Sequence, residues 1–144
     1  MNQTDKKTPV HLWIVGILAV LWNAVGAFDY TATQLQLESY MGQFSQEQLD
    51  YFFGFPVWMD AAWAIAVWSS ILGSLCLLLR KSWAVSLFGL SILGLAVSTV
   101  YNFGMSNGLE VMGSGGAAFS AVIWVVAILL YIYAQGMTKR QVLK

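Results

Sequence analysis

The sequence predicts an all-α membrane protein, a single domain over residues 1–144 in which a bundle of four transmembrane helices places both termini in the cytoplasm. Hydrophobic residues make up 58% of the chain and charged residues only 10%, whereas a soluble domain carries about 25% charged residues. The apolar residues gather in four stretches, and the lysines and arginines all lie between or beyond these stretches.

The four stretches predict spans at about residues 10–29, 57–79, 83–102 and 116–135. About 20 apolar residues are needed to cross a hydrocarbon core about 30 Å thick. Each span must satisfy its own backbone hydrogen bonds in lipid, which favours helices over strands. A cleaved signal peptide is the alternative for the first stretch, because Lys6 and Lys7 precede it and the small residues 25–27 resemble a cleavage site. We expect this stretch to be retained as a span, since it is about as long as the others.

The cations set the expected orientation. All seven fall on the same side of the four predicted spans. They are Lys6, Lys7, Arg80, Lys81, Lys139, Arg140 and Lys144. The positive-inside rule places that side in the cytoplasm. The acids lie at or beyond the opposite face, except Asp5.

The connections between spans differ in length. Only residues 80–82 separate the second and third spans, which must therefore be antiparallel neighbours, with Ser82 as the expected N-cap of the third. Residues 30–55 connect the first two spans, and Ser45 to Gln48 has the pattern of a capping box. We expect one or two short interfacial helices there, covering the outer mouth of the bundle. The glycine-rich residues 102–115 predict a compact or mobile loop.

The second span contains a row of small residues spaced four residues apart. The row consists of Ala62, Ala66, Ser70 and Ser74. Small residues let a neighbouring helix approach closely in lipid. We expect this row to pack within the chain, with a seam between copies of the chain as the alternative.

The composition excludes several function classes. His11 and Cys76 are the only histidine and cysteine, so neither a disulfide within the chain nor a histidine–cysteine metal site is expected. The net charge is zero and basic residues do not cluster, which argues against nucleic-acid binding. Without an acid–base or nucleophile constellation, we expect no enzyme and no cofactor. The expected partners are the lipid bilayer and, in addition, either further copies of the chain or a larger membrane complex.

Polar and aromatic residues from three spans share a depth in the outer half. They are Asn23, Asp29, Tyr30, Asp60, Trp63, Tyr101 and Asn102. Polar side chains within a span are functional candidates because lipid penalises them. One interpretation is an outward-opening ligand pocket in which Asp29 and Asp60 approach each other. The other assigns Asp60 to a helix N-terminus, where the dipole favours a carboxylate, and Asn23 to a bond between helices. The fourth span lacks charges and looks purely structural.

The string Trp22-Asn23, Gly26, Asp29-Tyr30 and Thr33-Gln34, followed by Phe55-Pro56, Ala62-Trp63-Ala64 and Trp83-Ala84, resembles a family of short bacterial four-helix inner-membrane proteins. Members of that family are often labelled sugar transporters, and the resemblance covers about residues 20–105. In layout alone the chain is also similar to the DoxX-like membrane proteins. The resemblance implies a multi-pass protein of the bacterial inner membrane that transports a small, sugar-like solute. Because four short helices rarely enclose a full pathway, we expect such a transporter to act as an oligomer. The alternatives are an accessory or assembly subunit of a membrane complex, or a module that binds a quinone or lipid.

Overall fold

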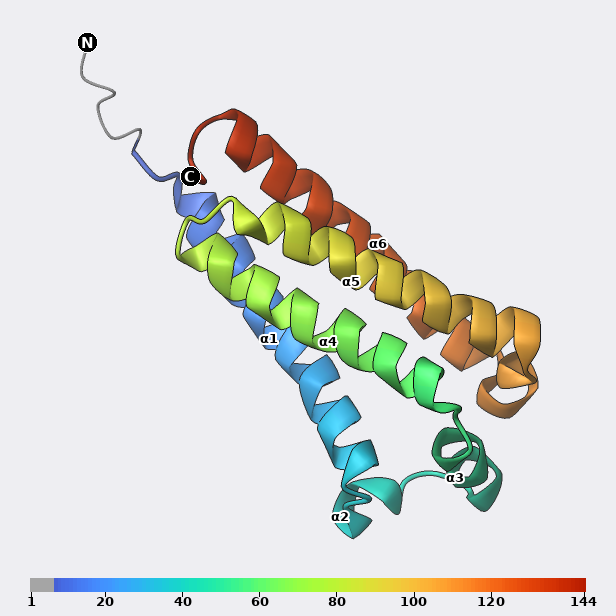
Figure 1. Cartoon of the computed structure of the whole chain (residues 1–144). Coiled ribbons are helices and arrows are strands. Elements are labelled where there is room, and N and C mark those ends of the chain that lie inside the picture. The colour runs from blue at the N-terminus through green and yellow to red at the C-terminus, as the bar shows by residue number, and fades with distance from the viewer. Residues whose placement is uncertain (1–6) are drawn as a thin grey trace.

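Helices form nearly all of the computed structural model, which describes residues 7–144 (Figure 1). Asp5 and Lys6, used above for the orientation, lie outside the described residues. The long helices are α1 (Val10–Gln34), α4 (Val57–Leu78), α5 (Trp83–Val100) and α6 (Gly108–Lys139). Two short helices, α2 (Glu38–Met41) and α3 (Gln46–Phe53), connect α1 to α4, and the π-helix η1 (Tyr101–Met105) extends α5.

Within residues 7–144, four helices are long and apolar enough to cross a membrane, as the sequence predicts for a multi-pass membrane protein. The first three of these helices begin at Val10, Val57 and Trp83, the residues at which the sequence places the starts of the spans. Pro9 and Pro56 occupy the N-cap positions of α1 and α4, where extended backbone precedes the helix. α1 continues to Gln34, five residues beyond its expected end, because nothing in the sequence stops the helix at the membrane surface.

The loop expected over residues 102–115 is largely helical, so that prediction is wrong. The π-helix η1 uses the first part of this segment, and α6 begins at Gly108, with only Ser106 and Asn107 between them. Gly113 has a φ of 73° and a ψ of −173°, which are not helical, so α6 consists of two helical pieces joined at a kink. A glycine adopts this conformation at little cost. The glycines of this segment therefore place one break in a helix and do not make an open loop.

The turn between α4 and α5 is held by backbone hydrogen bonds and not by the expected cap. Ser82 has helical φ and ψ angles, and its side chain makes no capping bond. Its backbone N–H donates to the carbonyl of Lys144 at 3.1 Å, while the N–H of Lys144 donates to Arg80 at 3.0 Å. Arg80 adopts a φ of 57°, and the N–H of Lys81 donates to Cys76 to close α4.

The small residues of α4 pack inside the chain, as expected. A side chain on Gly94 of α5 would place its Cβ 2.7 Å from the carbonyl oxygen of Ala62 and 2.9 Å from the backbone nitrogen of Ala66. The Ser91 hydroxyl donates to the Ala66 carbonyl at 2.7 Å, and Ser74 is fully buried against α1. α4 thus lies between α1 and α5, while α6 packs along α5 (Figure 1).

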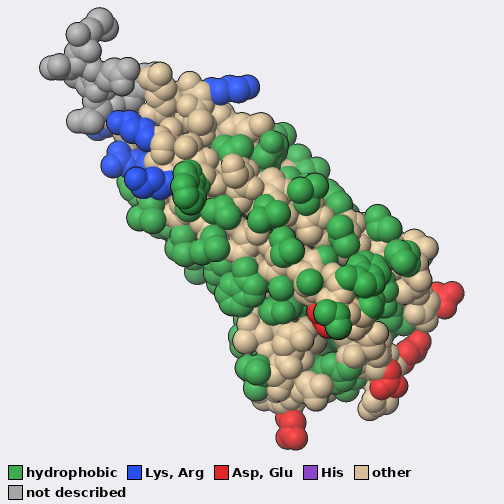
Figure 2. Space-filling model, viewed as in Figure 1, with side chains coloured by type: hydrophobic (Ala, Val, Ile, Leu, Met, Phe, Trp, Pro, Cys, Tyr) green, Lys and Arg blue, Asp and Glu red, His purple; other side chains and the backbone are tan. Residues whose placement is uncertain are grey.

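The best-packed part of the bundle lies near the two chain ends. Its buried core consists of Leu12, Ala19, Leu77, Ala84, Phe88, Leu130, Ala134, Met137 and Leu143. The described cations gather at this end, and the acids at the opposite end, as Figure 2 shows. We call these the basic end and the acidic end. The charge separation expected from the sequence is thus present along the long axis of the molecule.

The acidic end is covered by α2 and α3 (Figure 1). The predicted capping box at the start of α3 is confirmed: the Ser45 hydroxyl accepts from the N–H of Gln48, whose side chain in turn accepts from the N–H of Ser45. The Gln48 amide also reaches the Val111 carbonyl of α6 at 3.5 Å. α3 therefore contacts α6, the last helix of the chain. We call α2 and α3 together the cover of the bundle.

Candidate functional site

Asn23 is a buried polar residue of α1 whose side chain is bonded to α4. It is only 9% exposed, and its amide donates to the Ser74 hydroxyl at 2.7 Å and to the Ser70 carbonyl at 3.3 Å. This is the bond between helices that the alternative interpretation assigned to Asn23. These hydrogen bonds satisfy the amide in an apolar environment and fix α1 against α4.

Asp29 is half-buried near the acidic end of α1, where its carboxylate accepts a hydrogen bond from the Tyr40 hydroxyl of α2 at 2.5 Å. Burial, followed by the hydrogen bond to Asp29 and the charge of Asp29, raises the pKa of Tyr40 well above its ordinary value. The phenol of Tyr40 therefore remains a proton donor to the carboxylate at any physiological pH. This bond ties the cover to the first span.

Asp29 and Asp60, the two carboxylates of the predicted pocket, have different hydrogen-bond partners. Asp60 accepts from the Gln34 side chain at 3.2 Å on an exposed part of the surface, and it lies in the first turn of α4. A carboxylate there complements the partial positive charge of the helix N-terminus. Asp60 therefore lies at a helix N-terminus, as the alternative interpretation of the sequence assigned it.

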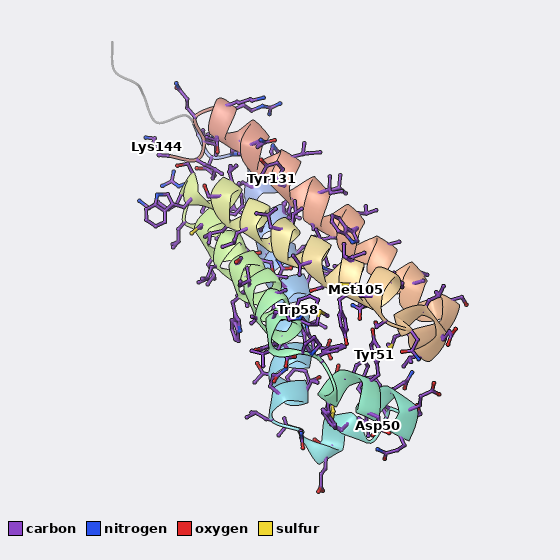
Figure 3. The ribbon with its side chains drawn as sticks, turned by 45° about the vertical axis from the view of Figure 1, so that its right-hand side comes forward. Asp50, Tyr51, Trp58, Met105, Tyr131 and Lys144 are labelled. Carbon is purple, nitrogen blue, oxygen red and sulfur yellow. The ribbon has the colours of Figure 1, made fainter. Side chains whose placement is uncertain are left out.

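Tyr101 and Asn102 belong to η1 and have different surroundings. The Tyr51 hydroxyl of α3 donates to Asn102 at 2.6 Å and lies 2.7 Å from the Ser106 hydroxyl; Figure 3 shows Tyr51 between α3 and the bundle. Burial raises the pKa of Tyr51. The Tyr101 ring packs against Phe55 and Trp58, with ring centroids 5.5 and 5.4 Å away. This cluster attaches α3 to the far end of α5.

A cavity of about 560 Å³ occupies the acidic half of the bundle. Its lining comes from all four long helices and from the cover. Of the seven candidate residues, Asn23, Asp29, Trp63 and Asn102 line the cavity, whereas Tyr30, Asp60 and Tyr101 do not belong to its lining. Tyr30 instead packs its ring against Trp63 at 5.0 Å and Trp68 at 6.4 Å. Whether any of the seven binds a ligand stays a prediction.

The cavity wall is mostly apolar, with a few hydroxyls. Phe88 and Leu130, both members of the packed core, form its floor. The serine and threonine hydroxyls come from Thr33, Ser70, Ser91, Ser98, Thr99 and Ser120, and Tyr40 and Tyr51 add two phenol hydroxyls. Pockets of this size with a few polar groups in an apolar wall are typical of small-molecule sites.

Five aromatic rings form a continuous surface along one side of the cavity. They are Tyr40, Phe44, Phe52, Phe55 and Trp63, which we call the aromatic wall. Successive ring centroids lie 5.7, 5.2, 6.2 and 6.1 Å apart, each pair close to edge-to-face. All five rings are half-buried. Tyr40, at one end of the aromatic wall, is the hydrogen-bond partner of Asp29.

The contribution of α6 and of the cover was missed by the sequence interpretation. α6 was expected to be purely structural, yet Met112, Phe119 and Ser120 line the cavity. Tyr40 also escaped attention, because a loop tyrosine carries no periodicity that would direct it inward. One sequence feature could have indicated the role of α6. Residues 113–118 are all small, which leaves room for a cavity between α6 and the other helices.

Comparisons with protein-family models, curated protein sequences and solved structures give no match for this chain. Among the described residues, no group of three His, Cys, Asp or Glu side chains could hold a metal ion. The candidate site is therefore a cavity whose only carboxylate in the lining is Asp29.

Proposed function

We propose that this multi-pass membrane protein binds a small, mostly apolar molecule with a polar end inside its helical bundle. The observation that carries the proposal is the cavity of about 560 Å³ in the acidic half. Its wall offers aromatic and aliphatic surface for an apolar body, with Asp29, Asn102 and several hydroxyls for a polar group. This is the ligand-binding module that the sequence offered as an alternative to transport.

The closed floor of the cavity favours binding over an open pathway. Below Phe88 and Leu130 the basic end is filled by the buried core, including Leu12 and Leu77, which are fully buried. A solute in the cavity would have to displace this core to reach the basic end. Transport remains the second candidate, since a carrier with a one-sided cavity would need such a closed face in one of its states.

The chemistry of the wall does not suit a sugar. A sugar carries hydroxyls around its whole perimeter, and each buried hydroxyl without a partner costs free energy. The Tyr40 hydroxyl is already bonded to Asp29, the other four rings of the aromatic wall carry no hydroxyl group, and the aliphatic part of α6 supplies no such partners. We therefore propose an amphiphile as the ligand class in place of the sugar-like solute implied by the family resemblance.

The route of entry that we propose runs between α1 and α6. These helices make few contacts with each other; near the basic end His11 is hydrogen bonded to Tyr133 at 2.6 Å, and further along Trp22 meets Phe119 at 6.1 Å between ring centroids. Val25 of α1 lines the cavity and is 64% exposed. An amphiphile dissolved in the bilayer could enter there without crossing the cover.

The proposed orientation rests on the distribution of charge, and the proposed location rests on the family resemblance. We propose that the basic end faces the cytoplasm, by the positive-inside rule, and that α2 and α3 lie at the opposite membrane surface. A bacterial inner membrane is the location that the family resemblance supports. An accessory role in a larger complex is compatible with ligand binding, because a partner could pack against the lipid-facing side of α6 while the cavity remains accessible.

Filling the cavity tests the proposal. Ser120→Trp places a large ring into the cavity from α6, and no described hydrogen bond of the Ser120 side chain is lost. The control Ala118→Trp adds the same ring to an exposed position of α6 outside the lining. Decylubiquinone, a neutral apolar probe with a polar ring, should raise the Tm of the purified parent and of Ala118→Trp, because ligands stabilise the state that binds them.

Ser120→Trp should lose most of that increase in Tm. Equal stabilisation of all three proteins would show that the probe acts from the micelle and not from the cavity. If decylubiquinone does not stabilise the parent and tetraphenylphosphonium does not bind it, the proposed function is contradicted.

A further inference from the structure

Asp29 presents a carboxylate to the cavity with no basic side chain beside it. Its described side-chain partner is the neutral hydroxyl of Tyr40. The lysines and arginines of the described chain lie at the basic end, on the far side of the packed core (Figure 2). A carboxylate in an apolar setting is costly unless a cation or several donors accompany it. The cavity therefore lacks a positive charge, which a ligand could supply.

The aromatic wall also favours a positively charged ligand, independently of Asp29. The face of an aromatic ring attracts a cation, most strongly for Trp, and this attraction grows when water is excluded. The wall extends from Tyr40, which holds Asp29, to Trp63 of α4 without a gap between neighbouring rings. Aromatic cages of this kind recognise ammonium groups that carry apolar substituents.

We propose that the cavity binds a lipophilic organic cation, meaning an ammonium or phosphonium group that carries apolar substituents. Asp29 neutralises the charge, the aromatic wall contacts the cationic centre from one side, and the apolar substituents extend toward Phe88 and Leu130. This inference rests on the proposed function and specifies its ligand class. An anion is disfavoured by the same residues, and a neutral amphiphile would gain nothing from the charge of Asp29.

Two ions of nearly the same shape and opposite charge provide the test. Tetraphenylphosphonium and tetraphenylborate both present four phenyl rings around a central atom. Binding of each to the purified parent in nanodiscs of neutral lipid is measured by equilibrium dialysis, with empty nanodiscs to correct for partition into lipid. We expect saturable binding of tetraphenylphosphonium and none of tetraphenylborate. Saturable binding of both ions with similar Kd would overturn the inference with no mutation required.

The variant Asp29→Asn removes the charge while it keeps the size of the side chain. The matched control is Asp60→Asn, which removes one negative charge from the same end of the bundle but outside the cavity lining. We expect Asp29→Asn to weaken tetraphenylphosphonium binding at least about tenfold, the loss typical of a charged hydrogen-bonding partner. Asp60→Asn should leave Kd within about twofold, since Asp60 does not belong to the cavity lining.

The outcomes separate this inference from the proposed function. Equal Kd for Asp29→Asn and Asp60→Asn would refute the role of Asp29, while a loss of decylubiquinone binding in Ser120→Trp would still support the cavity. Binding of tetraphenylphosphonium that Ser120→Trp does not alter would place the cation elsewhere and overturn the inference. If neither probe binds the parent, both proposals fail together.

Discussion

At the residue scale, the polar groups within the spans divide into those that hold the bundle together and one that faces the cavity without a charged partner. The Asn23 amide is satisfied by α4, and the hydroxyls of Ser74, Ser98 and Thr99 donate to carbonyls within their own helices. Asp29 differs because its described side-chain bond comes from the cover, from Tyr40. A change in the protonation of either partner would therefore alter how the cover is attached.

The titration of Tyr40 tests this coupling. Its pKa is raised first by burial and then by Asp29, so in Asp29→Asn the pKa should fall but stay above the ordinary value of about 10. Absorbance at 295 nm against pH reports phenolate, and subtracting the Tyr40→Phe curve in each background isolates Tyr40. Because the folded-state pKa is raised, the stabilisation by protonated Tyr40 is complete below about pH 10 and is lost as the pH rises through the folded-state pKa. An unchanged Tyr40 titration in Asp29→Asn would show that the two groups are not coupled.

At the element scale, the contact between α4 and α5 depends on the absence of a side chain at Gly94. Backbone atoms of α4 occupy the space that a Cβ would need. Backbone cannot move aside as a flexible side chain can, so the two helices would have to separate. Ser91, one turn earlier, donates to the same stretch of α4 and would lose this bond if the helices moved apart.

We expect Gly94→Ala to lower the free energy of unfolding by about 1–3 kcal/mol, the usual cost of overpacking. Gly136→Ala is the control, because a Cβ there meets nothing within 4 Å and alanine favours a helix over glycine by about 1 kcal/mol. Thermal unfolding in detergent of both variants and the parent measures the difference. A Tm for Gly94→Ala at or above that of Gly136→Ala would mean that α4 and α5 do not meet in the way described.

The elements themselves could be predicted because the membrane demands about 20 apolar residues for each span. The capping box at Ser45 and the small-residue row of α4 were also readable, since both are local patterns with a fixed spacing. Residues 102–115 were misinterpreted because glycine content argues for a loop, whereas the segment is stabilised by contacts distant in sequence. The bonds from Tyr51 to Asn102 and Ser106 span more than fifty residues, and no local pattern indicates them.

At the scale of the whole molecule, the same reasoning shows why the candidate site was only partly predictable. The depth of a residue in the membrane follows from its position along the span. The sequence therefore placed Asn23, Asp29, Trp63 and Asn102, which line the cavity, at a similar depth. Rotation of each helix about its axis was not fixed by the sequence, because apolar residues surround these helices on every side. Tyr30, Asp60 and Tyr101 share the right depth but not the lining. The cavity itself arises from the arrangement of α6, which carries no charge in its lining part.

The separation of charge along the molecule leads to a prediction about its orientation. The basic end should face the cytoplasm, because lysines and arginines are retained on that side. In a variant in which Cys76 is replaced by Ser, single cysteines at Gln43, Asn107 and Ser82 are exposed to a membrane-impermeant maleimide. Gln43→Cys and Asn107→Cys, at the acidic end, should react in intact cells. Ser82→Cys, in the turn at the basic end, should react only after the membrane is permeabilised, which also serves as the control that its thiol is accessible. Reaction of Ser82→Cys in intact cells, with Gln43→Cys silent until permeabilisation, would invert the orientation and place the cavity in the cytoplasmic half of the bilayer.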